Sequence, residues 1–244
     1  MKIKKTLGVI GGLGPMATAY YMQLVTEMTE ANSDQDHFPM IIYSMPQIPD
    51  RTRYLLGQSQ DSPLEPILEC GRNLKRDGAD VLAIPCITAH AMHEQIQEGI
   101  DIPVIHAIKE CVSYLQERGI KKVGLEATDG TVSTGVFQKQ LEAAGIEVIL
   151  PGKEGQARVM EIIYGNVKAG IPVNIDAFAE VEKELVSAGA EVIILGCTEL
   201  SMVKRDYPLS DIYLDALEVL ARAAVLRCGK LRKEKEELIL QRGK

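Results

Sequence analysis

Short apolar segments alternate with longer segments of helical periodicity along most of this chain. The apolar segments are continuous and lack a period of two, which is typical of parallel strands buried on both faces. The pattern predicts strands at residues 6–10, 40–43, 81–84, 104–105 and 147–150, and helices at residues 17–31, 63–76, 88–97, 108–117 and 214–227. This alternation indicates an α/β fold with doubly wound parallel sheets.

An internal repeat divides the chain into two related halves. The segment Gly78–Cys86 matches Gly189–Cys197 in the order of its Gly, Ala, acidic residue, Val, apolar run and Cys. Residues 4–11 resemble residues 120–127 in the same way. We therefore expect two pseudosymmetric α/β domains with a ligand site between them.

The repeat also suggests where the domains begin and end. The first would comprise residues 1–118 and 210–244, because the helix expected at 214–227 would return to it, and the second would comprise residues 119–209. The charged tail, residues 230–244, has Leu231, Leu238 and Leu240 at weak helical spacing. We interpret it as a solvated helix end or a partner contact.

Composition narrows the classes of protein. The chain has 244 residues, of which 46% are hydrophobic and 25% charged, as in globular proteins. Its net charge of −7 argues against a nucleic-acid partner, and no apolar run approaches the ~20 residues of a membrane span. The five cysteines include no Cys-x-x-Cys pair, so we expect reduced thiols and a cytoplasmic location. His90 and His93 alone do not indicate a metal site.

Two of the cysteines occupy equivalent places in the repeat. Cys86 and Cys197 each follow a predicted strand and precede a predicted helix, and ligands bind at this edge of parallel sheets. Across a pseudo-twofold axis, the two thiols would lie on opposite walls of one cleft. Racemisation at an α-carbon needs this arrangement, with one group removing the proton and another returning it on the opposite face. A thiol suits the task where its pKa is lowered, as at a helix N-terminus.

The alternative is that these cysteines are buried apolar residues, which is the usual environment of a free cysteine. We assign that interpretation to Cys70, Cys111 and Cys228, which lie within predicted helices. The matched positions of Cys86 and Cys197 favour a functional pair.

A glycine-rich loop, Gly11–Ala17, follows the first predicted strand with the pattern G-x-G-x-x-A. A dinucleotide site would need an acidic residue at the end of the second strand, where Tyr43–Pro46 offers none. We therefore expect the loop's N–H groups to hold a substrate carboxylate. Arg51 and Lys168 are further candidate cations for the same anion.

These segments together resemble the aspartate/glutamate racemase superfamily, and within it the aspartate racemase branch. The resemblance rests on five stretches that occur in family order: Gly11–Thr18, Pro46–Thr52, Ile84–His90, Ala127–Thr131 and Leu195–Leu200. It implies a two-base mechanism that needs no pyridoxal phosphate, an amino acid as the small-molecule substrate, and a homodimer. Since the chain shows no metal-ligand spacing and no complete dinucleotide motif, we expect no cofactor or metal.

The resemblance also implies roles for individual residues. Cys86 and Cys197 match the catalytic cysteines, and by analogy with glutamate racemases Cys86 would deprotonate the D-enantiomer and Cys197 the L-enantiomer. Arg51 and Lys168 match cations associated with the distal carboxylate. Further positions match residues that line the pocket: Met16, Gln47, Thr88, Thr128 and Thr198.

Two residues depart from the family pattern. Ile87 stands where the family usually has an Asn whose amide holds the substrate, and a buried carboxylate short of one donor costs about 1–3 kcal/mol. Glu126 stands where an apolar residue is common, and near the cleft it could repel an acidic substrate or hold an amine.

These features leave three hypotheses. The first is an amino-acid racemase, with aspartate the first candidate substrate and glutamate the second. The second keeps the fold and changes the substrate, as in hydantoin racemases, maleate isomerases and arylmalonate decarboxylases, although the decarboxylases use a single cysteine. The third is a ligand-binding homologue whose turnover is impaired because of Ile87.

Overall fold

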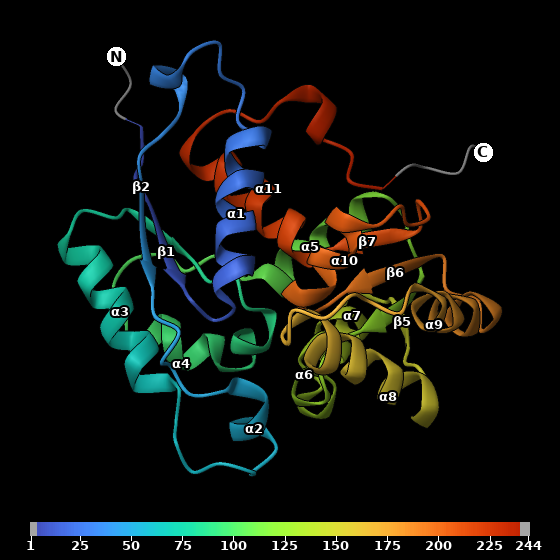
Figure 1. Cartoon of the computed structure of the whole chain (residues 1–244). Coiled ribbons are helices and arrows are strands. Elements are labelled where there is room, and N and C mark those ends of the chain that lie inside the picture. The colour runs from blue at the N-terminus through green and yellow to red at the C-terminus, as the bar shows by residue number, and fades with distance from the viewer. Residues whose placement is uncertain (1–3, 240–244) are drawn as a thin grey trace.

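The computed structural model describes residues 4–239, and within them the strands form two parallel sheets (Figure 1). The sheet of the first half has the strand order β2-β1-β3, and the sheet of the second half has the order β5-β4-β6-β7. Helices cover both sheets, so the predicted α/β class with parallel sheets is confirmed.

The first half contains β1 (Leu7–Gly11), α1 (Pro15–Met28), β2 (Met40–Ser44), α2 (Arg51–Leu55), α3 (Leu64–Arg76), β3 (Val81–Ala83), the 3-10 helix η2 (Ile87–Met92), α4 (His93–Glu98) and α5 (Ala107–Glu117). The second half contains β4 (Lys122–Glu126), α6 (Asp129–Thr134), α7 (Val136–Ala143), β5 (Glu147–Ile149), α8 (Lys153–Met160), the π-helical segment η3 (Glu161–Val167), α9 (Ile175–Ser187), β6 (Val192–Leu195), α10 (Thr198–Asp206) and β7 (Tyr213–Asp215). The chain continues into α11 (Ala216–Cys228).

The two sheets are built alike. In each, the first strand of the half lies at the centre, between the second and third strands. They differ at the fourth position, where β7 pairs with β6 but the first half has only a single bridge between Leu82 and Val104. The strand predicted at 104–105 is therefore reduced to that bridge.

Strand β7 also corrects the expected end of the second domain. Its pairing with β6 extends the second sheet to Asp215, beyond the boundary at residue 209 that the repeat suggested. The helix expected from residue 214 begins at Ala216, because the Asp215 side chain caps it by accepting a 2.8 Å hydrogen bond from the Leu217 N–H. The helix then packs on α1 and α5 of the first half.

The largest apolar core runs between the halves. Side chains of α11 such as Leu217 and Leu220 belong to the same cluster as Val123 and Leu125 of β4 and Leu24 of α1. Figure 1 shows α11 beside α1, with α5 close to the second sheet. The two halves are therefore held by shared packing as well as by the chain. No helix within residues 4–239 is long and apolar enough to cross a membrane.

The described part of the tail is not an α-helix. Leu231 forms an antiparallel bridge with Thr29, and the hydroxyl of Tyr114 accepts a 2.6 Å hydrogen bond from the Leu238 N–H. Arg118 Nε lies 2.8 Å from Glu237 Oε2. These contacts hold residues 230–239 against the first half with only a short 3-10 turn, so the predicted helical stripe is wrong there. Leu240 and the rest of the tail lie outside the described residues.

Candidate active site

A small pocket lies between the two halves at the carboxyl ends of the central strands. Both repeated cysteines line it, together with side chains from each half. Its lining is Leu13, Asp50, Arg51, Thr52, Cys86, Thr88, Thr128, Tyr164, Lys168, Cys197 and Glu199. The pocket thus contains Arg51, Cys86, Thr88, Thr128, Lys168 and Cys197, six residues that the sequence singled out.

The two cysteines reach the pocket through the same local structure. Cys86 precedes η2 and Cys197 precedes α10, and both residues have extended backbone at the helix N-cap. Their side chains are 6% and 4% exposed. Gly196 lets the second loop pass close to β4, because a Cβ there would lie 2.9 Å from a Leu125 methyl carbon.

Cys86 has a cation beside it. The buried Arg51 guanidinium is anchored by Nη1, which donates to the carbonyls of Ile48 and Pro49 at 3.2 and 3.0 Å. Its Nε has no hydrogen-bond partner among residues 4–239. Burial lowers the pKa of Arg51, but the charge of Cys86 and a hydrogen bond to it outweigh this, so the net shift is upward. The Nε–H of this buried cation therefore remains available to an anion.

Cys197 has a carboxylate beside it. Its Sγ donates to Glu199 Oε2 at 2.9 Å, and Glu199 Oε1 accepts a 2.5 Å hydrogen bond from Lys168 Nζ. Burial raises the pKa of Cys197 well above its usual value, and the Glu199 charge raises it further while Lys168 opposes both. This thiol is therefore held in its protonated form.

Three threonine hydroxyl groups, contributed by both halves, lie close together at the pocket. The Oγ1 atoms of Thr88, Thr128 and Thr131 lie 3.1 Å from one another in each pairing, and Thr128 also caps α6 by accepting from the Thr131 N–H. Since Thr88 comes from the first half and the other two from the second, this cluster ties the halves together at the pocket.

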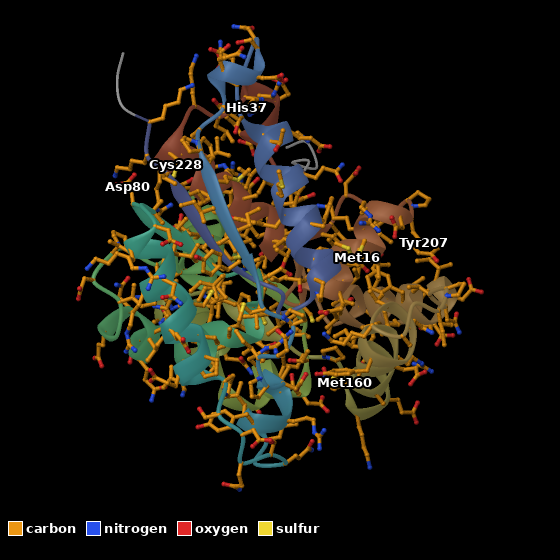
Figure 2. The ribbon with its side chains drawn as sticks, turned by 60° about the vertical axis from the view of Figure 1, so that its left-hand side comes forward. Met16, His37, Asp80, Met160, Tyr207 and Cys228 are labelled. Carbon is orange, nitrogen blue, oxygen red and sulfur yellow. The ribbon has the colours of Figure 1, made fainter. Side chains whose placement is uncertain are left out.

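Four other predicted residues do not line the pocket. Met16 is 63% exposed at the start of α1 (Figure 2), and Gln47 is exposed as well. Thr198 is buried, but its hydroxyl is directed to Glu199 Oε2 at 3.4 Å. The expectation that these three line the pocket needs correction, because Met16 and Gln47 are exposed and the Thr198 hydroxyl is hydrogen-bonded to Glu199.

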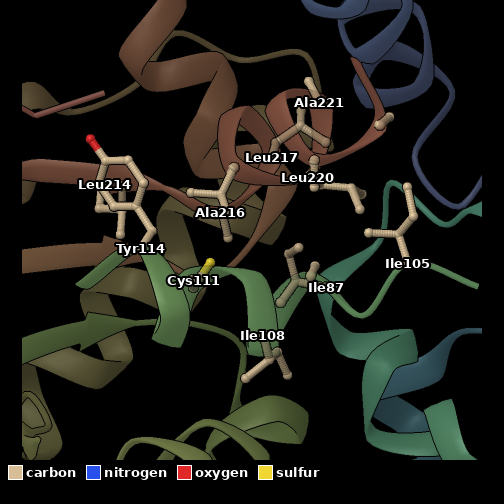
Figure 3. Close-up of a cluster of buried hydrophobic side chains, with 14 of the residues drawn as sticks. Ile87, Ile105, Ile108, Cys111, Tyr114, Leu214, Ala216, Leu217, Leu220 and Ala221 are labelled. Carbon is tan, nitrogen blue, oxygen red and sulfur yellow. The ribbon is translucent and has the colours of Figure 1, made fainter. Parts of the chain in front are cut away.

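Ile87 is the fourth. It is 1% exposed and lies in the core between the halves, near Ile105, Ile108 and Leu217 (Figure 3). The turn that points Cys86 and Thr88 into the pocket points the residue between them the other way. The missing Asn amide therefore leaves no gap in the described pocket.

Glu126 also differs from the expectation. It is fully buried on the side of β4 that faces α9, and neither carboxyl oxygen has a hydrogen-bond partner among residues 4–239. Burial raises the pKa of Glu126 well above its usual value, and the charge of Glu182 adds to this effect. It belongs to the core of the second half and neither repels nor binds a ligand in the pocket.

The glycine-rich loop serves packing more than anion binding. The N–H of Gly12 donates to Thr18 Oγ1 at 2.9 Å, so it is not free for a substrate carboxylate. Gly12 has a φ of 84°, and a Cβ there would lie 2.2 Å from the backbone nitrogen of Met45. The loop must be glycine to let the two backbones approach, and it contributes only Leu13 to the pocket.

Three histidines of the first half, one of them in η2, stack on one another. The ring centroids of His93 and His106 are 4.1 Å apart, and His90 lies within 5.8 Å of both. Burial, with a smaller effect of neighbouring histidines, lowers the pKa of His90 to about 3 and that of His106 to about 3. Within the described residues, no group of three or more His, Cys, Asp or Glu side chains could hold a metal ion.

Some pocket residues escaped the sequence analysis. Glu199 follows Cys197 at the same spacing as Thr88 follows Cys86, and that equivalence is a signal that could have found it. Asp50 directly precedes Arg51, and that position could have identified it as a pocket residue. Tyr164 had no such signal, because it enters the pocket from η3, far along the chain from both cysteines.

The sequence and the fold are both similar to those of known racemases. The model of the Asp/Glu/hydantoin racemase family matches residues 10–224. A broad-specificity amino-acid racemase of Bacillus subtilis is 29% identical over 90% of this chain and 96% of its own. The structure of Picrophilus torridus aspartate racemase superposes with a TM-score of 0.80 and 30% identity, covering 95% of this chain and 98% of that one. Glutamate racemase from Francisella tularensis, at 20% identity and a TM-score of 0.60, shares the fold.

The chain belongs to the Asp/Glu/hydantoin racemase family. Within it, the similarity to the Picrophilus torridus aspartate racemase structure supports the aspartate racemase branch. The protein is an enzyme of the isomerase class, a racemase.

Proposed function

We propose that the protein interconverts the L- and D-enantiomers of an amino acid by two-base proton transfer between Cys86 and Cys197. The observation that carries the proposal is the pair of equivalent thiols in one pocket, one beside Arg51 and the other hydrogen-bonded to Glu199. Aspartate is the first candidate substrate and glutamate the second. A homodimer and a cytoplasmic location remain predictions.

In the proposed mechanism the α-carbon lies between the two sulfur atoms. Cys86, with the Arg51 cation beside it, removes the α-proton as a thiolate, and the Cys197 thiol delivers its proton to the opposite face. The departing proton leaves Cys197 as a thiolate, whose charge Lys168 offsets. In the opposite direction the roles exchange. The free Nε of Arg51 and the threonine hydroxyls would stabilise the negative charge that develops on the substrate carboxylate.

The structure weakens the binding-only hypothesis. That hypothesis rested on Ile87, whose side chain lies in the core and does not line the pocket, so it removes no ligand contact there. A racemase of the same fold with another substrate, such as a neutral amino acid or a hydantoin, stays a second candidate, since the Bacillus subtilis relative carries the name broad-specificity amino-acid racemase.

The test is α-proton exchange in D₂O, followed by ¹H NMR and polarimetry. The purified protein is incubated with each enantiomer of aspartate, glutamate and a panel of neutral amino acids, and with a 5-substituted hydantoin. We expect loss of the α-proton signal together with loss of optical rotation on at least one amino acid. Exchange on the hydantoin alone would replace the amino-acid assignment, and absence of exchange on all compounds would refute the proposed function.

A further inference from the structure

The pocket between the thiols is narrow in this structure. Its cavity volume is only about 10 Å³, room for no more than one water molecule. Sites that hold small molecules typically measure roughly 300–1,000 Å³. An amino acid therefore cannot bind unless a wall of the pocket moves.

Tyr164 lies between this pocket and a larger groove on the surface, and it lines both. The open surface groove has a volume of about 600 Å³ and is also lined by Asp129, Gln156 and Met160. Movement of this side chain would join the two spaces without disturbing either cysteine.

The contacts of Tyr164 suit a side chain that closes over a ligand. Its hydroxyl lies 3.4 Å from Asp50 Oδ2 of the first half, a long hydrogen bond that bridges the two halves. Lys168 Nζ lies 5.4 Å from the centre of its ring, within the range of a cation–π contact. Both contacts are weak enough to break when a ligand enters.

The segment that carries Tyr164 is itself irregular. η3 (Glu161–Val167) is π-helical and lies between the end of α8 and a turn that begins at Lys168. Such segments are often found at functional sites. Because Lys168 follows directly, a shift of η3 would also displace the lysine that pairs with Glu199.

We propose that Tyr164 is the specificity-determining side chain of the pocket, the partition that opens for the amino acid and then limits the size of its side chain. The inference rests on the proposed racemase function and names what that site selects. With Tyr164 in place, small side chains are accepted. With a smaller residue at position 164, the pocket extends into the surface groove and accepts large substrate side chains.

The test compares exchange rates on a large and a small amino acid. The measured quantity is kcat/KM for phenylalanine divided by kcat/KM for the best of alanine, serine and aspartate, by α-proton exchange in D₂O. Tyr164→Ala should raise this ratio at least about tenfold, since discrimination by side-chain size in a pocket spans roughly 10–200-fold per methylene. Tyr164→Leu, which retains more apolar bulk in the fold, should raise it in the same direction.

Two controls separate size from other effects. Tyr164→Phe keeps the ring and removes the hydroxyl, so the ratio should stay as in the wild type while KM rises for every substrate. Tyr207→Ala removes an equally large, half-buried ring of the same half that does not line the pocket (Figure 2). It should leave the ratio unchanged.

The outcomes distinguish this inference from the function on which it rests. Wild-type exchange on a small amino acid, with a ratio that stays the same in folded Tyr164→Ala and Tyr164→Leu, would overturn the inference alone. An equal rise in Tyr164→Phe or Tyr207→Ala would overturn it too, because bulk at position 164 would not be the cause. Wild-type protein without exchange on any amino acid would overturn both.

Discussion

Cys86 and Cys197 occupy equivalent positions in the two halves, yet the residues beside them differ. After Cys86 come Ile87 and Thr88, and after Cys197 come Thr198 and Glu199. The third residue of each set reaches the pocket, as a hydroxyl on one wall and as a carboxylate on the other. The repeat thus preserved the backbone that presents a thiol and changed the charge around it.

That difference has a chemical use. In the proposed mechanism one thiol must start without its proton and the other with it. The cation beside Cys86 and the carboxylate bonded to Cys197 would favour that distribution. Lys168, bonded to Glu199, can offset the charge when the roles reverse.

The largest effect is expected from removing either thiol. Cys86→Ser and Cys197→Ser should each lower the racemisation rate by about 10²–10⁴-fold, the usual contribution of a positioned acid or base. Each variant should still exchange the α-proton of one enantiomer, because the other thiol remains, and the two variants should favour opposite enantiomers. Racemisation rate and exchange of each enantiomer are measured separately.

The matched control for this pair is Cys228→Ser. Cys228 is a buried cysteine of α11 that does not line the pocket, and its variant should retain the wild-type rate. Near wild-type racemisation by Cys86→Ser would contradict a mechanism with two thiol bases.

The second effect concerns Ile87, the residue between Cys86 and Thr88. Ile87→Asn places an amide in the apolar core, and the lost packing together with the buried amide should lower the free energy of unfolding by about 2–4 kcal/mol. Ile87→Val should cost only about 0.5–1.5 kcal/mol. Urea denaturation of both variants measures the difference. A stable Ile87→Asn variant with faster turnover of aspartate would mean that residue 87 faces the pocket after all.

The third effect is a loss of stability at low pH that originates in the first half and not in the second. All four histidines lie in the first half, three of them in the buried stack. The pKa of folded His90, about 3, is below the unfolded value of 6.5, so its contribution to stability is present above pH 6.5 and is lost as the pH falls toward 3. For His90 alone, the free energy of unfolding should drop by about 2 kcal/mol between pH 7 and pH 5.

Denaturant unfolding at both pH values tests this loss. His90→Asn should show a smaller drop than the wild type, whereas His37→Asn, outside the stack, should show the full drop. Hydrogen exchange should find the early acid-induced opening in the first half. A drop that His90→Asn leaves unchanged would exclude this histidine as its source.

The smallest effect concerns the charge beside Cys197. Glu199→Gln keeps the shape of the side chain but removes the charge that helps raise the pKa of Cys197, so that pKa should fall. The pH at which Cys197 loses its proton should move lower, and proton donation by Cys197 should become faster, because a thiol of lower pKa is the stronger acid. The pH profile of kcat/KM for each enantiomer measures both changes. Thr88→Val on the opposite wall should leave that limb of the profile in place, and an equal shift in both variants would contradict a specific role of Glu199.

The sequence predicted the parts of the site that depend on strand order. Strand–cysteine–helix units in a repeat dictate where Cys86 and Cys197 emerge, and the structure brings both to one pocket. Side-chain direction within a turn could not be predicted, since Ile87 and Thr88 adjoin but point to opposite sides. Nor could Tyr164 be found, because its approach depends on how η3 lies against the first half. The missed boundary at β7 has the same origin, as a three-residue strand gains its pairing from β6 and not from its own pattern.

Helix α11 has a consequence for how the protein is made. It lies between α1 and α5, which end at Met28 and Glu117, about a hundred residues or more before α11 begins at Ala216, and most of its side chains are buried there. A growing chain on the ribosome presents α1 and α5 long before α11 is synthesised, so their apolar faces stay uncovered through most of translation. We expect nascent chains that end before residue 216 to bind chaperones and to aggregate when released, and the first half to reach its native packing only after the second half has been completed.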